Sequence, residues 1–210
     1  MDLRNYRQQY NKGDLERDQL DEDPFIQFEK LFAKAKEAGV PEPNAMTLAT
    51  SDERYGADAR IVLLKEIIYN EFIFFTNYLS SKGQQLTRCP NAALLFWWPQ
   101  SECQIRIRGD VKRINSEESD AYFYSRPHDS RAGAITSQQS RVVEDYNELM
   151  RRFEEIKALP DEQLERPVHW GGFALSPIEF EFWQGRPNRM HDRFLYQHTD
   201  NHWIIKRLSP

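Results

Sequence analysis

The sequence lacks the features that mark several large classes of protein. It has only two cysteines, Cys89 and Cys103, which stand at no metal-ligand spacing and cannot form a disulfide framework. No apolar run approaches the roughly 18–20 residues that a membrane-spanning helix needs. Lys and Arg (28) are outnumbered by Asp and Glu (33), which excludes a typical nucleic-acid-binding composition. The common glycine-rich phosphate loops, G-x-G-x-x-G and G-x-x-x-x-G-K, are also missing.

The remaining composition predicts a soluble cytoplasmic protein. Residues 1–6 contain no apolar segment of the kind found in secretory signals. His169, His198 and His202 have no partners at metal-ligand spacing, so no metal site is expected. Apolar residues make up 40% of the chain, enough for a real core, and 210 residues favour one large domain over two small ones.

The chain divides into a polar arm and one domain. Residues 1–22 are almost entirely polar and are predicted to be a mobile N-terminal arm, followed by a single domain over 23–210. Asp23-Pro24 is typical of a helix start, and Gly39 with Pro41 should end that helix. A helical insertion is expected over about 116–159, with helices at 116–125, 131–134 and 143–159.

Elsewhere the apolar period is two, which indicates strands. They are predicted over Ala45–Thr50, Ala59–Glu66, Glu71–Thr76, Ala92–Trp98, Gln104–Arg108, Phe173–Ser176, Glu179–Gln184, Phe194–Gln197 and Trp203–Arg207. A turn should span 51–56, and a short helix should begin at Ser80 or Ser81. Short strands at close spacing favour an antiparallel barrel, so the expected class is mainly β with flanking helices.

Polar and aromatic residues gather near the C-terminus, in Glu181–Gly185 and Arg189–Tyr196. Trp can cover a planar ring, and two Arg with a His can hold anionic groups beside it. This mixture indicates a site for a planar, charged small molecule. The alternative is a polar strand–turn–strand whose charges are solvated.

Three further segments could bind anions. In Arg60–Lys65 the two end charges leave on opposite faces of a strand, although ordinary strand-end cations would look the same. Thr76 and Lys82 flank a strand end and a helix start, where a serine N-cap is the simpler explanation. Tyr122, Arg126 and Ser130 are spaced four apart and, if helical, form a phosphate clamp on one face, although Pro127 interrupts a simple helix. Gln139 and Ser140 could contact a ring or a phosphate.

Together these segments resemble the pyridoxine/pyridoxamine 5′-phosphate oxidase family, from about Arg7 to the C-terminus. The matching blocks stand in family order and at near-family spacing: Arg60–Lys65, Phe75–Asn77 with Lys82, Gln104, Tyr122–Ser130, Gln139-Ser140, Trp170-Gly171-Gly172, Glu181–Gly185, Arg189–Tyr196 and Arg207–Pro210.

The resemblance implies an FMN-binding split β-barrel, assembled as a homodimer with FMN at the interface. The FMN contacts that it implies from one subunit are Arg60, Ile61, Val62, Leu63, Leu64, Lys65, Phe75, Thr76, Ser81, Lys82 and Gln104. Those implied from the other subunit are Gln139, Ser140, Trp183 and Arg193. Ser81 departs from the family, which usually has Arg there, and this bears on FMN affinity rather than on the reaction type.

The resemblance also implies where the substrate binds. Its phosphate would be held by Lys65, Tyr122, Arg126 and Ser130. Arg189 and His191 would lie over the pyridine ring as the catalytic pair. Arg7 and Tyr10 match an N-terminal Arg and Tyr that can close over the site in this family.

The activity implied is FMN-dependent oxidation of pyridoxamine or pyridoxine 5′-phosphate by O2 to pyridoxal 5′-phosphate and H2O2. One alternative is a phenazine-biosynthesis flavin oxidase, which has no need of the phosphate clamp. Another is a non-catalytic flavin- or haem-binding split barrel, which has no need of Arg189 and His191 over a ring.

Overall fold

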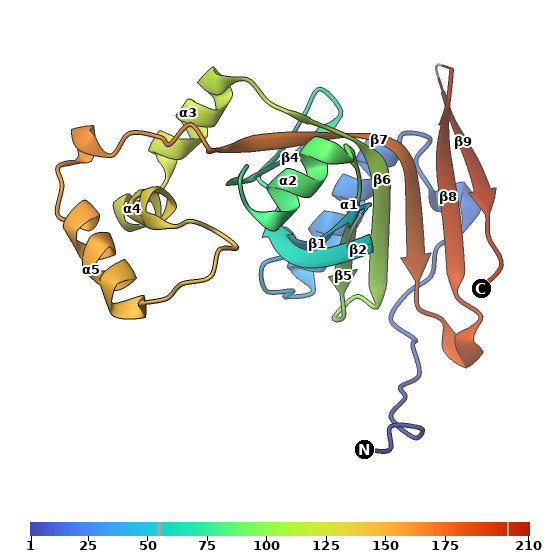
Figure 1. The fold of residues 1–210 in the computed structure, drawn as a ribbon. Coiled ribbons are helices and arrows are strands. Elements are labelled where there is room, and N and C mark those ends of the chain that lie inside the picture. The colour runs from blue at the N-terminus through green and yellow to red at the C-terminus, as the bar shows by residue number, and fades with distance from the viewer. Residues whose placement is uncertain (54–55, 201) are drawn as a thin grey trace.

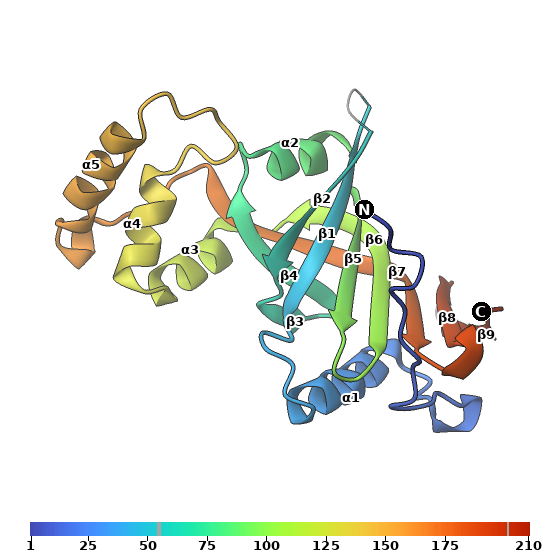
Figure 2. The same cartoon turned by 90° about the horizontal axis from the view of Figure 1, so that it is seen from below.

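The computed structural model describes residues 1–53, 56–200 and 202–210, and its centre is one antiparallel sheet. The strands are β1 (Ala45–Asp52), β2 (Gly56–Leu63), β3 (Glu66–Ile68), β4 (Glu71–Asn77), β5 (Asn91–Trp98), β6 (Cys103–Arg113), β7 (Trp170–Gln184), β8 (Asp192–Thr199) and β9 (His202–Arg207). The strand order is β2-β1-β5-β6-β7-β4-β3, with β8 on β7 and β9 on β8. The sheet curves strongly, as Figure 2 shows.

Strand β7 explains the shape of this sheet. Along one edge it pairs with β6 over almost its whole length. Along the other edge its first half pairs with β4 and its second half with β8. A β-bulge at Arg108/Gly109 lets β6 follow this bend, and a side chain at Gly109 would overlap the backbone of Ser176. The sheet therefore splits into two branches along β7.

The helices flank the sheet (Figure 1 and Figure 2). They are α1 (Pro24–Glu37), α2 (Ser81–Arg88), α3 (Ser116–Ser125), α4 (His128–Thr136) and α5 (Tyr146–Lys157). Helices α3–α5 form a lobe at one end of the molecule, and β8 and β9 lie at the other end. Among the described residues, no helix has the length and apolar character needed to span a membrane.

Helix α1 closes the core because its apolar face meets the inside of the sheet. Its start agrees with the prediction: the Asp23 side chain accepts a hydrogen bond from the Phe25 N–H, with Pro24 at the first position. The Phe28 ring, 2% exposed, lies with its centroid 5.2 Å from that of Phe72 and 5.1 Å from that of Phe96. Such aromatic packing supplies much of the burial that stabilises the fold.

Several predicted boundaries were wrong. The strand expected over Ala59–Glu66 ends at Leu63, and Glu66 begins the separate strand β3, so Lys65 lies between two strands. The strands expected at 173–176 and 179–184 are one continuous strand, β7. The turn expected over 51–56 falls partly outside the described residues, and Ser51 already belongs to β1.

The N-terminal arm contacts the barrel. Leu15 and Leu20 are 4% and 7% exposed and belong to the core cluster, although residues 1–22 have few apolar side chains. The Leu15 N–H donates to the Asp192 carboxylate. These two leucines place the second half of the arm on the domain, while the mobility of the arm stays a prediction.

Candidate functional site

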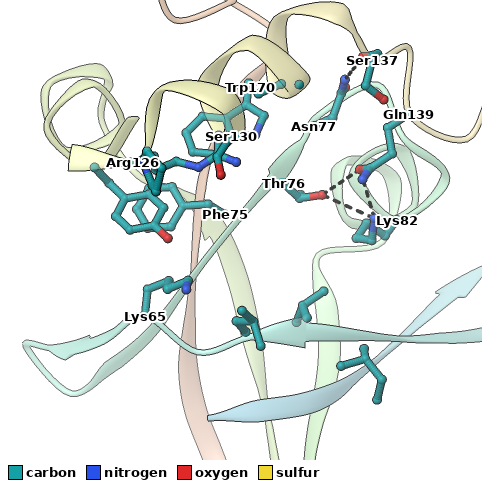
Figure 3. Close-up of a pocket in the computed structure, with 17 residues that line it drawn as sticks. Lys65, Phe75, Thr76, Asn77, Lys82, Arg126, Ser130, Ser137, Gln139 and Trp170 are labelled. Carbon is teal, nitrogen blue, oxygen red and sulfur yellow. Dashed lines mark hydrogen bonds between the residues drawn. The ribbon is translucent and has the colours of Figure 1, made fainter. Parts of the chain in front are cut away.

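A cavity of about 620 Å³ lies between the barrel and the helical lobe. Strands β2 and β4, helix α2 and the α3–α4 junction contribute its walls. The residues that line it are Ile61, Val62, Leu63, Lys65, Phe75, Thr76, Asn77, Lys82, Tyr122, Arg126, Pro127, Ser130, Gly133, Ala134, Ser137, Gln139 and Trp170. In Figure 3, Thr76, Lys82 and Gln139 lie together on one side, and Arg126, Ser130 and Trp170 lie together on another.

Lys82 is the first anion-binding candidate in this cavity. It sits in the first turn of α2 and is only 8% exposed. Its ammonium donates to Thr76 Oγ1 at 3.4 Å and to Gln139 Oε1 at 3.2 Å, both neutral acceptors. Burial, and then the nearby Arg60 charge, lower the pKa of Lys82 below its ordinary value. A buried ammonium with neutral partners is arranged to receive an anion.

Arg126 is the second candidate. It follows α3 as the C-cap residue in extended conformation, and Pro127 is then the N-cap of α4, which begins at His128. Burial lowers the pKa of its guanidinium, and Nη1 is buried with no hydrogen-bond partner in the described part of the chain. A guanidinium at the cavity wall with no acidic partner among the described residues can bind an oxyanion.

The clamp predicted from Tyr122, Arg126 and Ser130 is brought together, but not on one helix. Tyr122 belongs to α3 and Ser130 to α4, because Pro127 cannot continue a helix from Arg126. All three nevertheless line the cavity, Tyr122 from α3, Arg126 from the junction and Ser130 from α4. Lys65 lines the same cavity with an exposed side chain.

Three parallel rings form one wall of the cavity. The centroids of Phe75 and Tyr122 are 3.9 Å apart, and the planes are inclined by 23°. Trp170 lies 5.6 Å from Phe75 at 14°. The guanidinium carbon of Arg126 is 4.7 Å from the centre of the Trp170 ring. Trp170 was in a matching block of the sequence but had been given no role.

The glycines after Trp170 explain how the indole reaches this wall. A side chain at Gly171 would overlap the Tyr78 hydroxyl, and one at Gly172 would overlap Ile114. Only glycine therefore lets the start of β7 approach β4 and α3 so closely. The Trp-Gly-Gly pattern was the signal in the sequence that could have identified Trp170.

Other residues expected at the flavin lie outside this cavity. Arg60 donates from Nη1 to Leu48 O and Thr50 Oγ1. Its Nη2 donates to the carboxylate of Asp58 and to Gln85. Leu64 is buried in the core, and Ser81 and Ser140 line a neighbouring hollow. Ser80 caps helix α2, because its hydroxyl accepts a hydrogen bond from the Gly83 N–H. The serine N-cap, the simpler explanation of this segment, is therefore present.

A second cluster forms where β7 ends and β8 begins. The ring centroids of Trp183 and His191 are 4.6 Å apart, and Tyr10 of the arm lies 5.7 Å from Trp183 and 5.8 Å from His191. Tyr10 and His191 line a small hollow, and Arg7 and Arg189 line it as well. Burial, and then the Arg189 charge, lower the pKa of His191. Its Nδ1 accepts the backbone N–H of Arg186, so in the neutral ring Nε2 carries the proton.

Arg193 and Gln104 lie beside this cluster on the same sheet face. Gln104 is directly opposite Trp183 in the β6–β7 ladder. Arg193 is paired with Glu181, 2.7 Å between Nη2 and Oε1. The buried Glu181 also accepts from Arg106. Glu181 therefore fixes the position of Arg193, a role that the sequence did not suggest.

The two clusters do not meet within one chain. Trp170 begins β7 and Trp183 stands near its end, about 40 Å apart along an extended strand. Figure 1 shows the same separation, with the helical lobe at one end of β7 and β8 at the other. The predicted site residues thus form two groups at opposite ends of the molecule. They are not the two sets expected from the two subunits, because Gln139 lies with Lys82 and Gln104 lies with Trp183.

The fold and the cavity define a split β-barrel that carries two separate cationic positions beside an aromatic wall. The profile of the family described as pyridoxamine 5′-phosphate oxidase matches residues 32–159. A second profile, described as the pyridoxine 5′-phosphate oxidase C-terminal dimerisation region, matches residues 170–210. The chain belongs to the pyridoxine/pyridoxamine 5′-phosphate oxidase family.

Individual relatives agree with this assignment. A pyridoxine/pyridoxamine 5′-phosphate oxidase of Paraburkholderia phymatum is 50% identical over 209 residues, covering 99% of both chains. One from a Nostoc species is 48% identical over 206 residues, covering 97% of this chain and 96% of its own. The crystal structure of PhzG from Burkholderia lata, in complex with tetrahydrophenazine-1-carboxylic acid, superposes with a TM-score of 0.87 at 30% identity, covering 92% of this chain and 95% of that one. These matches confirm the predicted split barrel.

Proposed function

We propose that this protein oxidises pyridoxamine 5′-phosphate or pyridoxine 5′-phosphate with O2, using FMN, to give pyridoxal 5′-phosphate and H2O2. The observation that carries the proposal is the pair of separate anion positions, Lys82 and Arg126, in one cavity. Such a cavity suits a cofactor and a substrate that each bear a phosphate. The similarity to oxidases of this name over the whole chain supports the same reading.

The described residues fit FMN. Lys82 with Thr76 offers buried donors without an acidic hydrogen-bond partner, which suits the cofactor phosphate. Ile61, Val62 and Leu63 offer an edge of strand beside the same cavity. When bound, FMN would supply the acceptor for the hydride equivalent that leaves C4′ of the substrate.

A homodimer would complete the site. Trp183, His191 and Arg193 are too far along β7 to reach the cavity of their own chain, so a second copy would bring them. The outer sheet face has the character of a contact surface, since Ile61 is 65% exposed and Trp97 is 44% exposed. The matching dimerisation-region profile over 170–210 supports this arrangement.

The chain's own residues would position the substrate. Arg126, Tyr122, Ser130 and Lys65 would hold the phosphate through charge-assisted hydrogen bonds. The lowered pKa of His191 favours the neutral ring, whose Nε2–H can donate a hydrogen bond to an acceptor on the pyridine ring. Arg189 would hold the ring from the same hollow, and Arg7 and Tyr10 would cover it and exclude water.

The overall reaction balances without a further reactant. The amine substrate, water and O2 give the aldehyde, ammonia and H2O2, and the alcohol substrate and O2 give the aldehyde and H2O2.

The domain arrangement proposed is the mobile arm over 1–22 and one flavin-binding domain over 23–210, in a cytoplasmic enzyme.

The second candidate is a phenazine-type flavin oxidase, which the superposition on PhzG favours. Its substrate would need no phosphate, so the Arg126 guanidinium at the cavity wall would have no anion to bind. A binding protein without turnover is the third candidate, and it leaves Arg189 and His191 unexplained.

One experiment separates these candidates. The purified protein is loaded with FMN, and H2O2 release is measured with pyridoxamine 5′-phosphate and with unphosphorylated pyridoxamine. The proposal expects steady turnover and a much lower KM for the phosphorylated amine. Equal KM values would favour a phosphate-independent oxidase, and bound FMN without peroxide would favour a binding protein.

A further inference from the structure

The Arg126 guanidinium has no acidic partner in the described part of the chain. No ion pair involves it, and Nη1 is buried without an acceptor. A long, flexible side chain of this kind loses rotamer freedom when it binds an anion, unless something already holds it. The group that touches it is the Trp170 ring, 4.7 Å from its central carbon. That distance suits a cation–π contact.

Trp170 is itself firmly held. It is 7% exposed, stacked on Phe75 and met edge-on by Phe123 at 5.3 Å between ring centroids. Its backbone carbonyl accepts from Arg166 Nη1 at 2.6 Å. The same Arg166 donates to Asp120 and Ser116, both in α3. Arg126 directly follows α3, so both partners of the cation–π contact are fixed to one helix.

We infer that Trp170 is a positioning residue for Arg126 and thereby determines the preference for phosphorylated substrates. The indole supports one face of the guanidinium, and the part of Arg126 that lines the cavity is left for the phosphate. This inference rests on the proposed function, because it names what sets the affinity of that same site. Trp170 acts through Arg126, so its removal should weaken phosphate binding without touching the reacting carbon.

The first test compares Trp170→Leu, Trp170→Phe and the control Trp203→Leu, which removes a half-buried indole on β9 outside the cavity. For FMN-loaded Trp170→Leu, the KM for pyridoxamine 5′-phosphate should rise about 2- to 30-fold, the range of a cation–π contact, with kcat within about twofold. Trp170→Phe should recover much of the loss. The KM for unphosphorylated pyridoxamine should stay unchanged in all three variants.

A double-mutant cycle tests whether Trp170 acts through Arg126. In an Arg126→Ala background, Trp170→Leu should raise KM by less than about twofold. An equal rise with and without Arg126 would overturn the inference, as would a fall in kcat with KM unchanged.

A binding measurement keeps the inference testable apart from turnover. Inorganic phosphate is titrated calorimetrically into the Lys82→Met protein, in which the other anion position is removed, with and without Trp170→Leu. Weaker binding by about 2- to 30-fold supports the inference even if the wild type oxidises nothing. Equal affinities refute it, whereas an inactive wild type refutes only the proposed function.

Discussion

Replacing Lys82 by Met should have opposite effects on cofactor binding and on stability. Met fills a similar volume but removes a charge that is 8% exposed and bonded only to the neutral Thr76 and Gln139. A charge-assisted hydrogen bond to phosphate contributes about 1.5–3 kcal/mol, so the Kd for FMN should rise about 10- to 150-fold. The apoprotein should instead gain on the order of 1 kcal/mol in its free energy of unfolding, because a desolvated charge is gone.

The pH dependence of the free energy of unfolding of the apoprotein gives a second readout of the buried charge on Lys82. The pKa of Lys82 in the folded chain lies below its ordinary value of 10.5, chiefly because of burial. Between the lowered value and 10.5, the unfolded chain binds a proton that the folded chain has released. The free energy of unfolding therefore rises with pH in this window for the wild type. The variant should lack that component.

The assay combines two titrations at one fixed protein concentration. Quenching of FMN fluorescence gives the Kd, and urea unfolding of the apoprotein at two alkaline pH values gives stability. Lys34→Met, on the exposed side of α1, is the matched control and should change neither quantity appreciably. If Lys82→Met lost stability and kept its FMN affinity, Lys82 would be a structural residue and the assignment of the cofactor phosphate would be wrong.

Three further perturbations have definite expected outcomes. Burial raises the pKa of Cys103 to about 12, so a thiol reagent should modify Cys89 in the native protein and both cysteines only after unfolding. Gly171→Ala should lower the free energy of unfolding by about 1–3 kcal/mol in urea titrations, because the methyl group has no room. Asp161→Asn should remove two components of the pH dependence of stability. Arg131 and His128 lower the pKa of Asp161 to about 2, and this stabilisation is lost as pH falls from 3.8 towards 2. The raised pKa of His128 contributes stability that is lost as pH rises through it.

For each of these three perturbations, one result would contradict the expected outcome. Rapid native modification of Cys103 would show that the core opens readily. A fully stable Gly171→Ala variant would show that β7 can move away from Tyr78. An unchanged pH dependence in Asp161→Asn, both in acid and where His128 titrates, would mean that the contacts of Asp161 with α4 contribute nothing measurable, as is common for exposed ion pairs.

The sequence specified local features well where one residue has one physical role. Asp23-Pro24 capped a helix as expected, because the cap and the fixed proline φ are local effects. The strands were mostly found, but the end of β2 was not, since Lys65 continues the alternating pattern without belonging to the ladder. Pairing partners, rather than residue pattern, decide where a strand ends.

The candidate site, like the fold, was predicted only in part. The convergence of Tyr122, Arg126 and Ser130 in one cavity was predicted, although from a single helix, which Pro127 breaks before Ser130. The role of Trp170 was missed because an apolar ring before two glycines is equally typical of a core strand. The hydrogen bonds of Arg60 within its own chain could not be foreseen, because they join residues far apart in sequence.

Strand β7 would couple the two active sites of the proposed dimer in genetic experiments. It begins beside the cavity of its own chain and ends beside Trp183, so in the proposed dimer each copy of β7 would serve two different active sites. A chain that cannot form its cavity and a chain that cannot form the Trp183 cluster would each be inactive when paired with themselves. When they pair with each other, one site collects both defects and the other collects none. Co-expression of two such inactive alleles should therefore restore activity through mixed dimers.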